Sequence, residues 1–327
     1  MRVLAIGRSE YLFEAIKRIS GFHQIVAIVT GPAAPESIVT ALDFESLAKD
    51  LGCGYLYAER IDDQVLSFCS KVKPDVGISV NWMSVIGESF LDIFPKGVLN
   101  AHCGDLPFYR GNAVLNWALV RGEKEIFVSV HSMMPGELDV GDVYAQRSFP
   151  IFESDDIAVL VRRVGGLIPI LFDEALSNVE IGSSVRSFSD VVSRGGFRCY
   201  PRLYQDGCID WSATAMDIDR LVKASARPYG GAYTCFLERG ELKKLTVWRS
   251  RYVGASSDVG VPGHVVLNDK ETGETHVYTG NGVVALQEVE LSGVGVFKPG
   301  AYFKSIRLRL GLSEGVLINL LETLRDK

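Results

Sequence analysis

Two polar side chains, Asn100 and His102, stand two residues apart at the end of an apolar run, Gly97-Val98-Leu99. If this run is a strand, positions 100 and 102 point to the same side. The pair then faces one space where a strand ends and a loop begins, which is a usual place for ligands in open α/β sheets. Asp139 stands downstream in the acidic segment 136–142. An amide donor, a titratable ring and a carboxylate are the minimum parts for acyl-group chemistry.

The first 100 residues alternate between strand and helix patterns, and this alternation predicts the sheet that positions these groups. It is typical of an α/β fold with a doubly wound, mostly parallel, Rossmann-like sheet. The turn Gly7-Arg8-Ser9 lacks the G-x-G-x-x-G pattern, so no dinucleotide fingerprint is expected. Strands are predicted at 2–6, 24–30, 55–57, 75–80 and 97–101, and helices at 10–19 (capped by Ser9), 43–51 and 62–72.

The pattern changes after residue 200, which predicts two domains, 1–200 and 201–327. The first is completed by helices at 112–121 and 155–176, with strands at 125–132 and 142–149 between them. The segment 182–201 is rich in Ser, Arg and Gly and is interpreted as a linker. A helix at 216–224 and short apolar runs between Gly-rich turns then predict a small β-barrel.

A last helix is predicted at 315–325. Its residues 316–321 are all apolar except Asn319. These side chains either pair two subunits in a homodimer or seal one core.

Composition limits the classes of function. With 47% hydrophobic and 23% charged residues, the 327-residue chain resembles an ordinary globular protein. Its net charge of −6 argues against a large polyanionic partner, so no nucleic acid is expected. No apolar run is long enough for a membrane span or a signal peptide. The six cysteines form no zinc spacing, so we expect no metal and a cytoplasmic location with reduced thiols.

The order of these motifs resembles the folate-dependent formyltransferases. The family pattern is Asn-x-His, then Leu-Pro-x-Tyr/Trp-Arg-Gly, then Leu-Asp-x-Gly. Here it is met by residues 100–102, 106–111 and 138–141. Residues 209–212 and 224–232 look like the start of the family's C-terminal, OB-like β-barrel. The resemblance implies transfer of a formyl group from the co-substrate N10-formyltetrahydrofolate to a primary amine.

The resemblance makes Asn100, His102 and Asp139 the expected catalytic residues. Asn100 would donate an N–H to the developing oxyanion, and Asp139 would orient His102. The role of His102 as base, acid or electrostatic helper stays open. Asp142 is the rival carboxylate, for which capping of loop amides is the alternative. His131 is the rival imidazole, for which a structural role is favoured.

The same resemblance predicts two sets of ligand contacts. The folate is expected against the largely apolar side chains of Trp82, Met83, Val85, Ile86 and Leu138. For Val85 and Ile86, burial in the core is the alternative. The amine substrate is expected to contact Arg8, Tyr109, Arg110 and Asn112. Arg110 could grip a phosphate or carboxylate, or bind loop carbonyls instead. Tyr109 could contact substrate or pack beneath the loop.

The sequence favours a sugar-nucleotide substrate. Leu115-Asn116-Trp117 and residues 244–251 look closest to the enzymes that act on UDP-4-amino-4-deoxy-arabinose. The region after the first strand, 32–40, lacks the basic loop expected for gripping a tRNA acceptor stem. A nucleotide-linked amino-deoxysugar is therefore expected, with a place in lipopolysaccharide or O-antigen biosynthesis and no membrane partner.

Three alternatives stand beside this interpretation: a methionyl-tRNA formyltransferase, a hydrolase that releases formate, and a binding protein without activity. The nucleotide, the sugar and the C3 or C4 position of the amine stay open.

Overall fold

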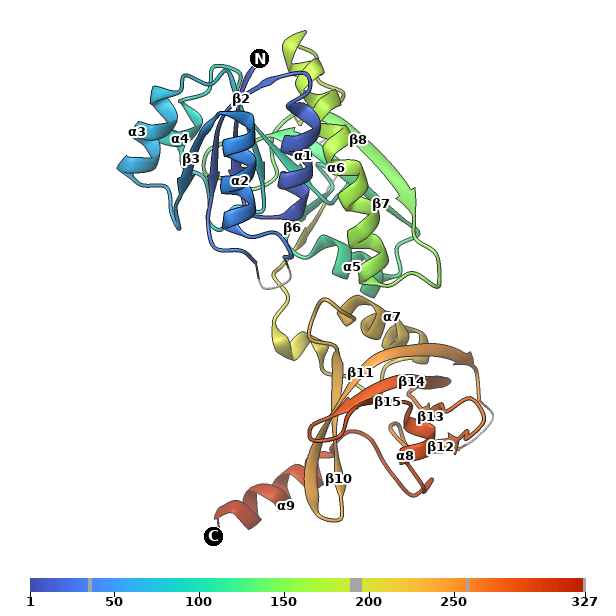
Figure 1. Cartoon of the computed structure of the whole chain (residues 1–327). Helices are drawn as coiled ribbons and strands as arrows, with labels where there is room; N and C mark the ends of the chain where they lie inside the picture. Colours follow the sequence, from blue (N-terminus) through green and yellow to red (C-terminus); the bar gives the residue numbers. More distant parts are fainter. Residues whose placement is uncertain (35–36, 189–195, 257–258, 326–327) are drawn as a thin grey trace. The chain divides into compact units, whose positions relative to one another are not determined.

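The computed structural model describes residues 1–34, 37–188, 196–256 and 259–325. Its backbone divides into two compact units (Figure 1). The first consists of Met1–Leu115, Lys124–Glu153 and Val159–Pro201. The second consists of Asn116–Glu123, Ser154–Ala158 and Arg202–Lys327.

Within the described residues, seven strands of the first unit form one sheet in the order β3-β2-β1-β4-β5-β7-β8. The first five are parallel, whereas β7 and β8 are antiparallel to their neighbours. The expectation of a doubly wound, mostly parallel sheet is therefore confirmed. The strands are β1 (Arg2–Gly7), β2 (Gln24–Thr30), β3 (Gly54–Tyr57), β4 (Val76–Val80), β5 (Val98–His102), β7 (Glu125–Ser132) and β8 (Val143–Pro150).

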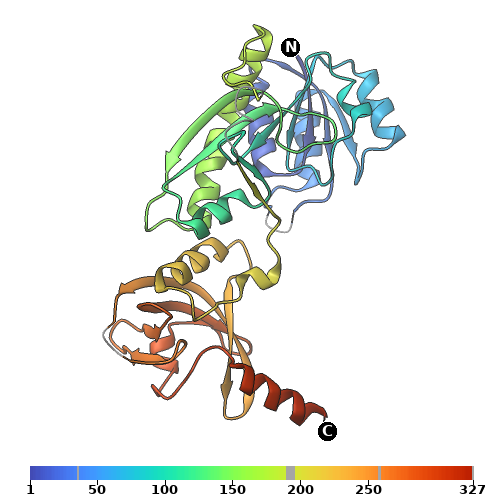
Figure 2. The same ribbon diagram turned by 180° about the vertical axis from the view of Figure 1, so that it is seen from behind.

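Helices cover both faces of this sheet, because its strands are apolar on both sides (Figures 1 and 2). Leu4 and Ile6 of β1 pack with α3 (Asp63–Lys71) and α4 (Glu88–Leu91). The opposite face is covered by α1 (Glu10–Ile19), α2 (Ala41–Leu51) and α6 (Ile157–Glu180).

Three local expectations need correction. Ser9 occupies the N-cap position of α1, but its side chain makes no capping hydrogen bond. The segment 32–40 follows the second strand, because it joins β2 to α2. The described part of 182–201 is no simple linker. Arg186 pairs by backbone with Val143, and β9 (Phe197–Cys199) pairs in parallel with β6 (Tyr109–Gly111). Residues 189–195 lie outside the described part.

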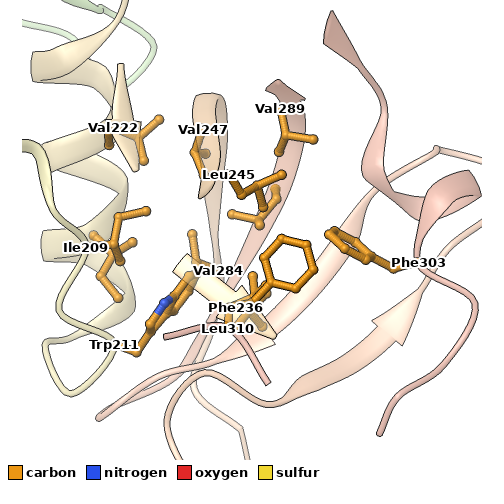
Figure 3. Close-up of a cluster of buried hydrophobic side chains, with 14 of the residues drawn as sticks. Ile209, Trp211, Val222, Phe236, Leu245, Val247, Val284, Val289, Phe303 and Leu310 are labelled. Atoms are coloured by element: carbon orange, nitrogen blue, oxygen red, sulfur yellow. The ribbon is translucent and has the colours of Figure 1, made fainter. Parts of the chain in front are cut away.

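The second unit is built on an antiparallel sheet in the order β10-β11-β14-β13-β12, with β15 paired to β14. The expected small β domain is confirmed, in the form of a curled half-barrel. Its core brings Trp211 and Phe236 together with Phe303 and Leu310 (Figure 3). The strands are β10 (Ala232–Glu238), β11 (Glu241–Gly254), β12 (Val265–Asn268), β13 (Thr275–Tyr278), β14 (Val283–Leu291) and β15 (Gly295–Phe297).

Short helices complete the second unit: η2 (Tyr204–Gly207), α7 (Ala215–Ser225), α8 (Pro299–Tyr302) and α9 (Glu314–Arg325). Leu317, Ile318 and Leu321 of α9 are all exposed. The alternative that these three side chains seal a core is therefore wrong, and subunit pairing stays a prediction. In the part of the chain that the structure describes, no helix has both the length and the apolar character to cross a membrane.

Candidate active site

Asn100 and His131 are held opposite each other by the antiparallel register of β5 and β7. Asn100 Nδ2 lies 3.3 Å from His131 Nε2, and His131 Nδ1 lies 2.8 Å from the carbonyl oxygen of Ser132. Since a carbonyl only accepts, Nδ1 carries the hydrogen and Nε2 accepts from Asn100. Burial lowers the pKa of His131, which keeps the ring neutral. This contact orients the Asn100 amide, and no described residue accepts its second N–H.

His102 faces a hydrogen-bond acceptor at each ring nitrogen. Its Nδ1 lies 3.4 Å from Asp139 Oδ1, and its Nε2 lies 2.8 Å from the carbonyl oxygen of Tyr109. Since a carbonyl only accepts, Nε2 carries a hydrogen, and Nδ1 faces the carboxylate. His102 is also 7% exposed, so both contacts are shielded from water. The arrangement places the imidazole and the Asn100 amide on the same face of β5.

Backbone geometry explains why the Leu-Asp-x-Gly motif carries an aspartate at 139 and a glycine at 141. Asp139 has a φ of +59°, a left-handed conformation that Asp and Asn tolerate better than most residues. Its Oδ2 accepts the Gly111 amide hydrogen at 2.9 Å, so the Tyr-Arg-Gly segment directly holds this carboxylate. A Cβ at Gly141 would lie 1.7 Å from the carbonyl oxygen of Ser132. Only glycine therefore fits at this position of the turn.

A network that sequence reasoning missed holds the loop after β5. Ser129 donates its hydroxyl to the Gly104 carbonyl at 2.6 Å and accepts from Gln146. Arg186 donates to Asp105 Oδ1 at 2.8 Å and to the Leu106 carbonyl at 2.7 Å. Arg186 stands 80 residues away in a segment without periodic pattern, so no signal in the sequence indicated it.

The structure places the predicted folate contacts in environments that differ in exposure to solvent. Val85 and Leu138 are exposed, and Trp82 and Met83 are half-buried. Trp82 Nε1 is buried and has no hydrogen-bond partner among the described residues. Ile86 is 2% exposed and belongs to the core beside α4, so its side chain offers no surface to a ligand. The core alternative is therefore right for Ile86 and wrong for Val85.

The predicted substrate contacts lie at two places in the first unit. Tyr109 and Arg110 are half-buried on β6, and Asn112 beyond it is exposed. Arg8 lies at the end of β1, where its Nη1 donates to the Pro32 carbonyl at 3.2 Å. Its backbone amide donates to the Val80 carbonyl, so the described hydrogen bonds of Arg8 do not involve Asn100, His102 or Asp139.

Asp142, the rival carboxylate, and two residues of the Leu-Asn-Trp motif have structural partners. Asp142 Oδ1 accepts from the Phe188 amide at 2.9 Å, which is the loop-capping alternative. Asn116 of α5 (Val114–Arg121) is 4% exposed and donates to the Ala224 carbonyl at 2.8 Å. Trp117 lies below the Arg202 guanidinium. Asn116 and Trp117 thus have packing partners within the second unit, and a role of the Leu-Asn-Trp motif in choosing the amine stays a prediction.

The fold and this group of amide, imidazole and carboxylate define an acyl-group transferase. Residues 1–176 match the family model "Formyl transferase", and residues 203–307 match "Formyl transferase, C-terminal domain". The chain therefore belongs to the formyl transferase family. This confirms the expectation of an enzyme that takes its formyl group from N10-formyltetrahydrofolate. Among the described residues, no cluster of three His, Cys, Asp or Glu could hold a metal ion.

Curated relatives include a methionyl-tRNA formyltransferase of Geobacter sulfurreducens, 28% identical over 96% of this chain and 97% of its own length. Another, from Pelotomaculum thermopropionicum, is also 28% identical and covers 96% of this chain and 99% of its own.

Solved structures share the fold at lower identity. WlaRD, described as a sugar 3N-formyl transferase, has a TM-score of 0.62 at 14% identity, over 90% of this chain and 98% of its own. An N-formyltransferase from Helicobacter canadensis has a TM-score of 0.64 at 13% identity, over 88% and 98%. HypX from Aquifex aeolicus, solved with tetrahydrofolic acid, has a TM-score of 0.57 at 19% identity. It aligns with 94% of this chain, and the chain spans about half (47%) of the length of HypX.

Proposed function

We propose that the enzyme formylates the primary amine of a nucleotide-linked amino-deoxysugar. The observation that carries this proposal is the connection between β2 and α2, where none of the residues 31–40 is Lys or Arg. A protein that grips a tRNA stem needs positive charge to neutralise phosphates. Residues 202–327 add almost no net positive charge, because they contain 16 Lys and Arg against 15 Asp and Glu.

The solved neighbours support the same substrate class. WlaRD was solved with dTDP, and the Helicobacter canadensis enzyme with dTDP-3-aminofucose and folinic acid. Each aligns over 98% of its own length, so this chain carries both units of such an enzyme.

The chemistry follows from the three catalytic residues. The reaction joins the amine nitrogen to the formyl carbon, breaks the bond from that carbon to the folate nitrogen, and moves one proton from amine to folate nitrogen. Negative charge develops on the formyl oxygen as the amine attacks. Asn100 donates to this oxygen the N–H that does not face His131, and His102 lies on the same face of β5. Asp139 orients the His102 ring, which can then act as base, acid or electrostatic helper in this step.

We place the formyl donor against the loop after β4 and the connection between β7 and β8. Val85 and Leu138 present exposed apolar side chains, which suit a flat heteroaromatic ring. Trp82 Nε1 is a buried donor without a described partner, which suits a carbonyl or ring nitrogen of a pterin. These residues would bind and orient the folate, which supplies the activated formyl group.

Methionyl-tRNA formyltransferase is the second candidate. It is favoured by the sequence relatives, which match this chain over nearly its full length at 25–29% identity. A tRNA substrate requires a positively charged protein surface, whereas a nucleotide sugar does not. The low positive charge of residues 31–40 and 202–327 therefore favours the nucleotide sugar.

A direct assay separates the candidates. Purified enzyme is incubated with formyltetrahydrofolate and a panel of dTDP-, UDP- and GDP-linked amino sugars, with methionyl-tRNA as a parallel acceptor. We expect turnover of at least one amino sugar and none of the tRNA. Formylation of methionyl-tRNA without turnover of any sugar overturns the proposal, and release of formate alone identifies a hydrolase.

A further inference from the structure

Two arginines, Arg110 and Arg198, are paired in register on the ribbon formed by β6 and β9. Strands that pair in a sheet lie about 4.8 Å apart, and paired residues extend their side chains from the same face. The two arginine side chains therefore start from neighbouring positions on one face of the ribbon. Like charges opposite each other destabilise a strand pair unless something compensates them.

Nothing in the described part of the chain compensates this pair. Neither guanidinium has a carboxylate or carbonyl partner there, whereas the nearby Arg186 has both. The Nε atom of Arg110 is buried without a described hydrogen-bond partner. A buried guanidinium N–H without a partner is costly, so Arg110 lacks a partner that a bound anion could supply.

The ribbon also lies directly beside the catalytic group. The Tyr109 carbonyl on one side of Arg110 accepts from His102, and the Gly111 amide on the other side donates to Asp139. A Cβ at Gly111 would lie 2.1 Å from the Cys199 carbonyl, so the glycine permits the close approach of β9. The same three residues of β6 thus contact the catalytic side chains through their backbone and present Arg110 from one face.

We propose that Arg110 and Arg198 bind the diphosphate group of the substrate. The identity of this ligand rests on the proposed function. The diphosphate bridge of a nucleotide sugar carries two negative charges on adjacent phosphorus centres, which match two adjacent guanidinium groups. Arginine binds phosphate oxygens through parallel, charge-assisted N–H···O bonds. The amine of the sugar, a few bonds from the diphosphate, then reaches Asn100 and His102.

Binding of nucleotide diphosphates tests this site without any turnover. Full-length enzyme is titrated by calorimetry with dTDP, UDP, GDP and inorganic pyrophosphate. Arg198→Gln removes an exposed side chain, so the fold stays intact, and Arg110→Gln is the second variant. Arg60→Gln, which removes an exposed arginine from the same unit, is the matched control. We expect Arg198→Gln to weaken the tightest of these ligands about 10- to 100-fold, with formyltetrahydrofolate binding unchanged and Arg60→Gln without effect.

The outcomes separate this inference from the proposed function. If no amino sugar is formylated but diphosphates bind and lose affinity in Arg198→Gln, the anion site stands and the proposed function fails. If an amino sugar is formylated with the same KM in wild type, Arg198→Gln and Arg110→Gln, the proposed function stands and the arginine site is wrong. Binding of methionyl-tRNA that depends on Arg198, without binding of any diphosphate, also overturns the site.

Discussion

Asn100 and His131 meet directly across β5 and β7, with 3.3 Å between Asn100 Nδ2 and His131 Nε2. The second nitrogen of His131 is bound to its neighbour's carbonyl, so the ring presents a lone pair to the amide. This makes His131 a positioning residue for the group that would stabilise the oxyanion, although it is not part of the Asn-x-His motif.

Replacement of His131 should therefore lower turnover through Asn100. We expect His131→Leu to reduce kcat about 10- to 100-fold, because misplacing one oxyanion donor has effects of this order. His131→Gln, whose side-chain oxygen can still accept from Asn100, should retain more activity. Steady-state kcat and KM for both substrates are the measurements.

The pH profile distinguishes positioning from proton transfer. Burial lowers the pKa of His131 from 6.5 to about 4, so the ring is already neutral near pH 7 and should add no titration to kcat there. The profile of His131→Leu should be lower than that of wild type and parallel to it. A change in the shape of the profile near pH 6–7 would assign His131 a proton-transfer role instead.

Asp139 offers a substitution that changes charge and keeps geometry. Its φ of +59° is accessible to Asn, and an Asn oxygen can still accept from Gly111. Asp139→Asn removes the negative charge that faces His102, so kcat should fall by orders of magnitude, about 10²-fold or more. The melting temperature should stay close to that of wild type. His102→Ala should cost a similar factor, and retention of most activity by both variants would refute the assigned roles.

Much of the first unit could be predicted from the sequence, because its signals are local. The β-branched run 24–30 and the apolar spacing of Leu12, Ile16 and Ile19 depend only on periods of two and 3.6 residues. The same period placed Asn100 and His102 on one face of a strand. The motif spacing then indicated Asp139, whose contact with His102 the structure contains.

The remainder of the site depends on tertiary pairing. His131 faces Asn100 only because β5 and β7 pair in one register, and a shift by one residue would turn it away. Strand β9 has three residues, too few for a periodic pattern, so Arg198 could not be placed beside Arg110. Asn116 lies on a predicted helix, but the spacing of a helix does not indicate which unit it packs against.

Gly104 tests how tightly the His102 ring is packed. A Cβ at this position would lie 2.1 Å from the Tyr109 carbonyl oxygen and 2.7 Å from His102 Nε2. Gly104→Ala should therefore displace the imidazole and lower kcat about tenfold or more, since small misplacements of catalytic groups are costly. Gly87→Ala is the matched control, because a Cβ there meets no heavy atom within 4 Å. Equal kcat values in the two variants would contradict the packing described for His102.

Substitution of Asn116 distinguishes a structural role of the Leu-Asn-Trp motif from a role in substrate binding. The amide of Asn116 donates to the Ala224 carbonyl in a buried position, and Arg202 Nη1 donates to the same carbonyl at 3.2 Å, so Asn116→Ala removes one of two donors. We expect a loss of about 0.5–1.5 kcal/mol in the free energy of unfolding, with KM for the amine substrate unchanged. Thermal unfolding and steady-state kinetics check the two parts. A raised KM at unchanged stability would assign the motif a role in substrate choice.

Glu274 should make the half-barrel sensitive to acid. Hydrogen bonds from Arg251, Gln287 and His276 offset the cost of burial and lower the pKa of Glu274 from 4.5 to about 2. A depressed carboxyl pKa stabilises the folded state above the unfolded value, and this contribution is lost as the pH falls from 4.5 towards 2. Arg251 is 46% exposed, which weakens the pair through solvent screening.

At pH 7 we therefore expect Glu274→Gln to lower the free energy of unfolding by about 2 kcal/mol. The difference between this variant and wild type should shrink steadily between pH 4.5 and 2, because wild type loses the contribution that the variant never had. Urea unfolding at a series of pH values measures both quantities. Glu271→Gln, an exposed glutamate in the preceding turn, is the control and should follow wild type throughout. A constant difference between Glu274→Gln and wild type across this range would mean that the packing of Glu274, and not the charge of its carboxylate, stabilises the half-barrel.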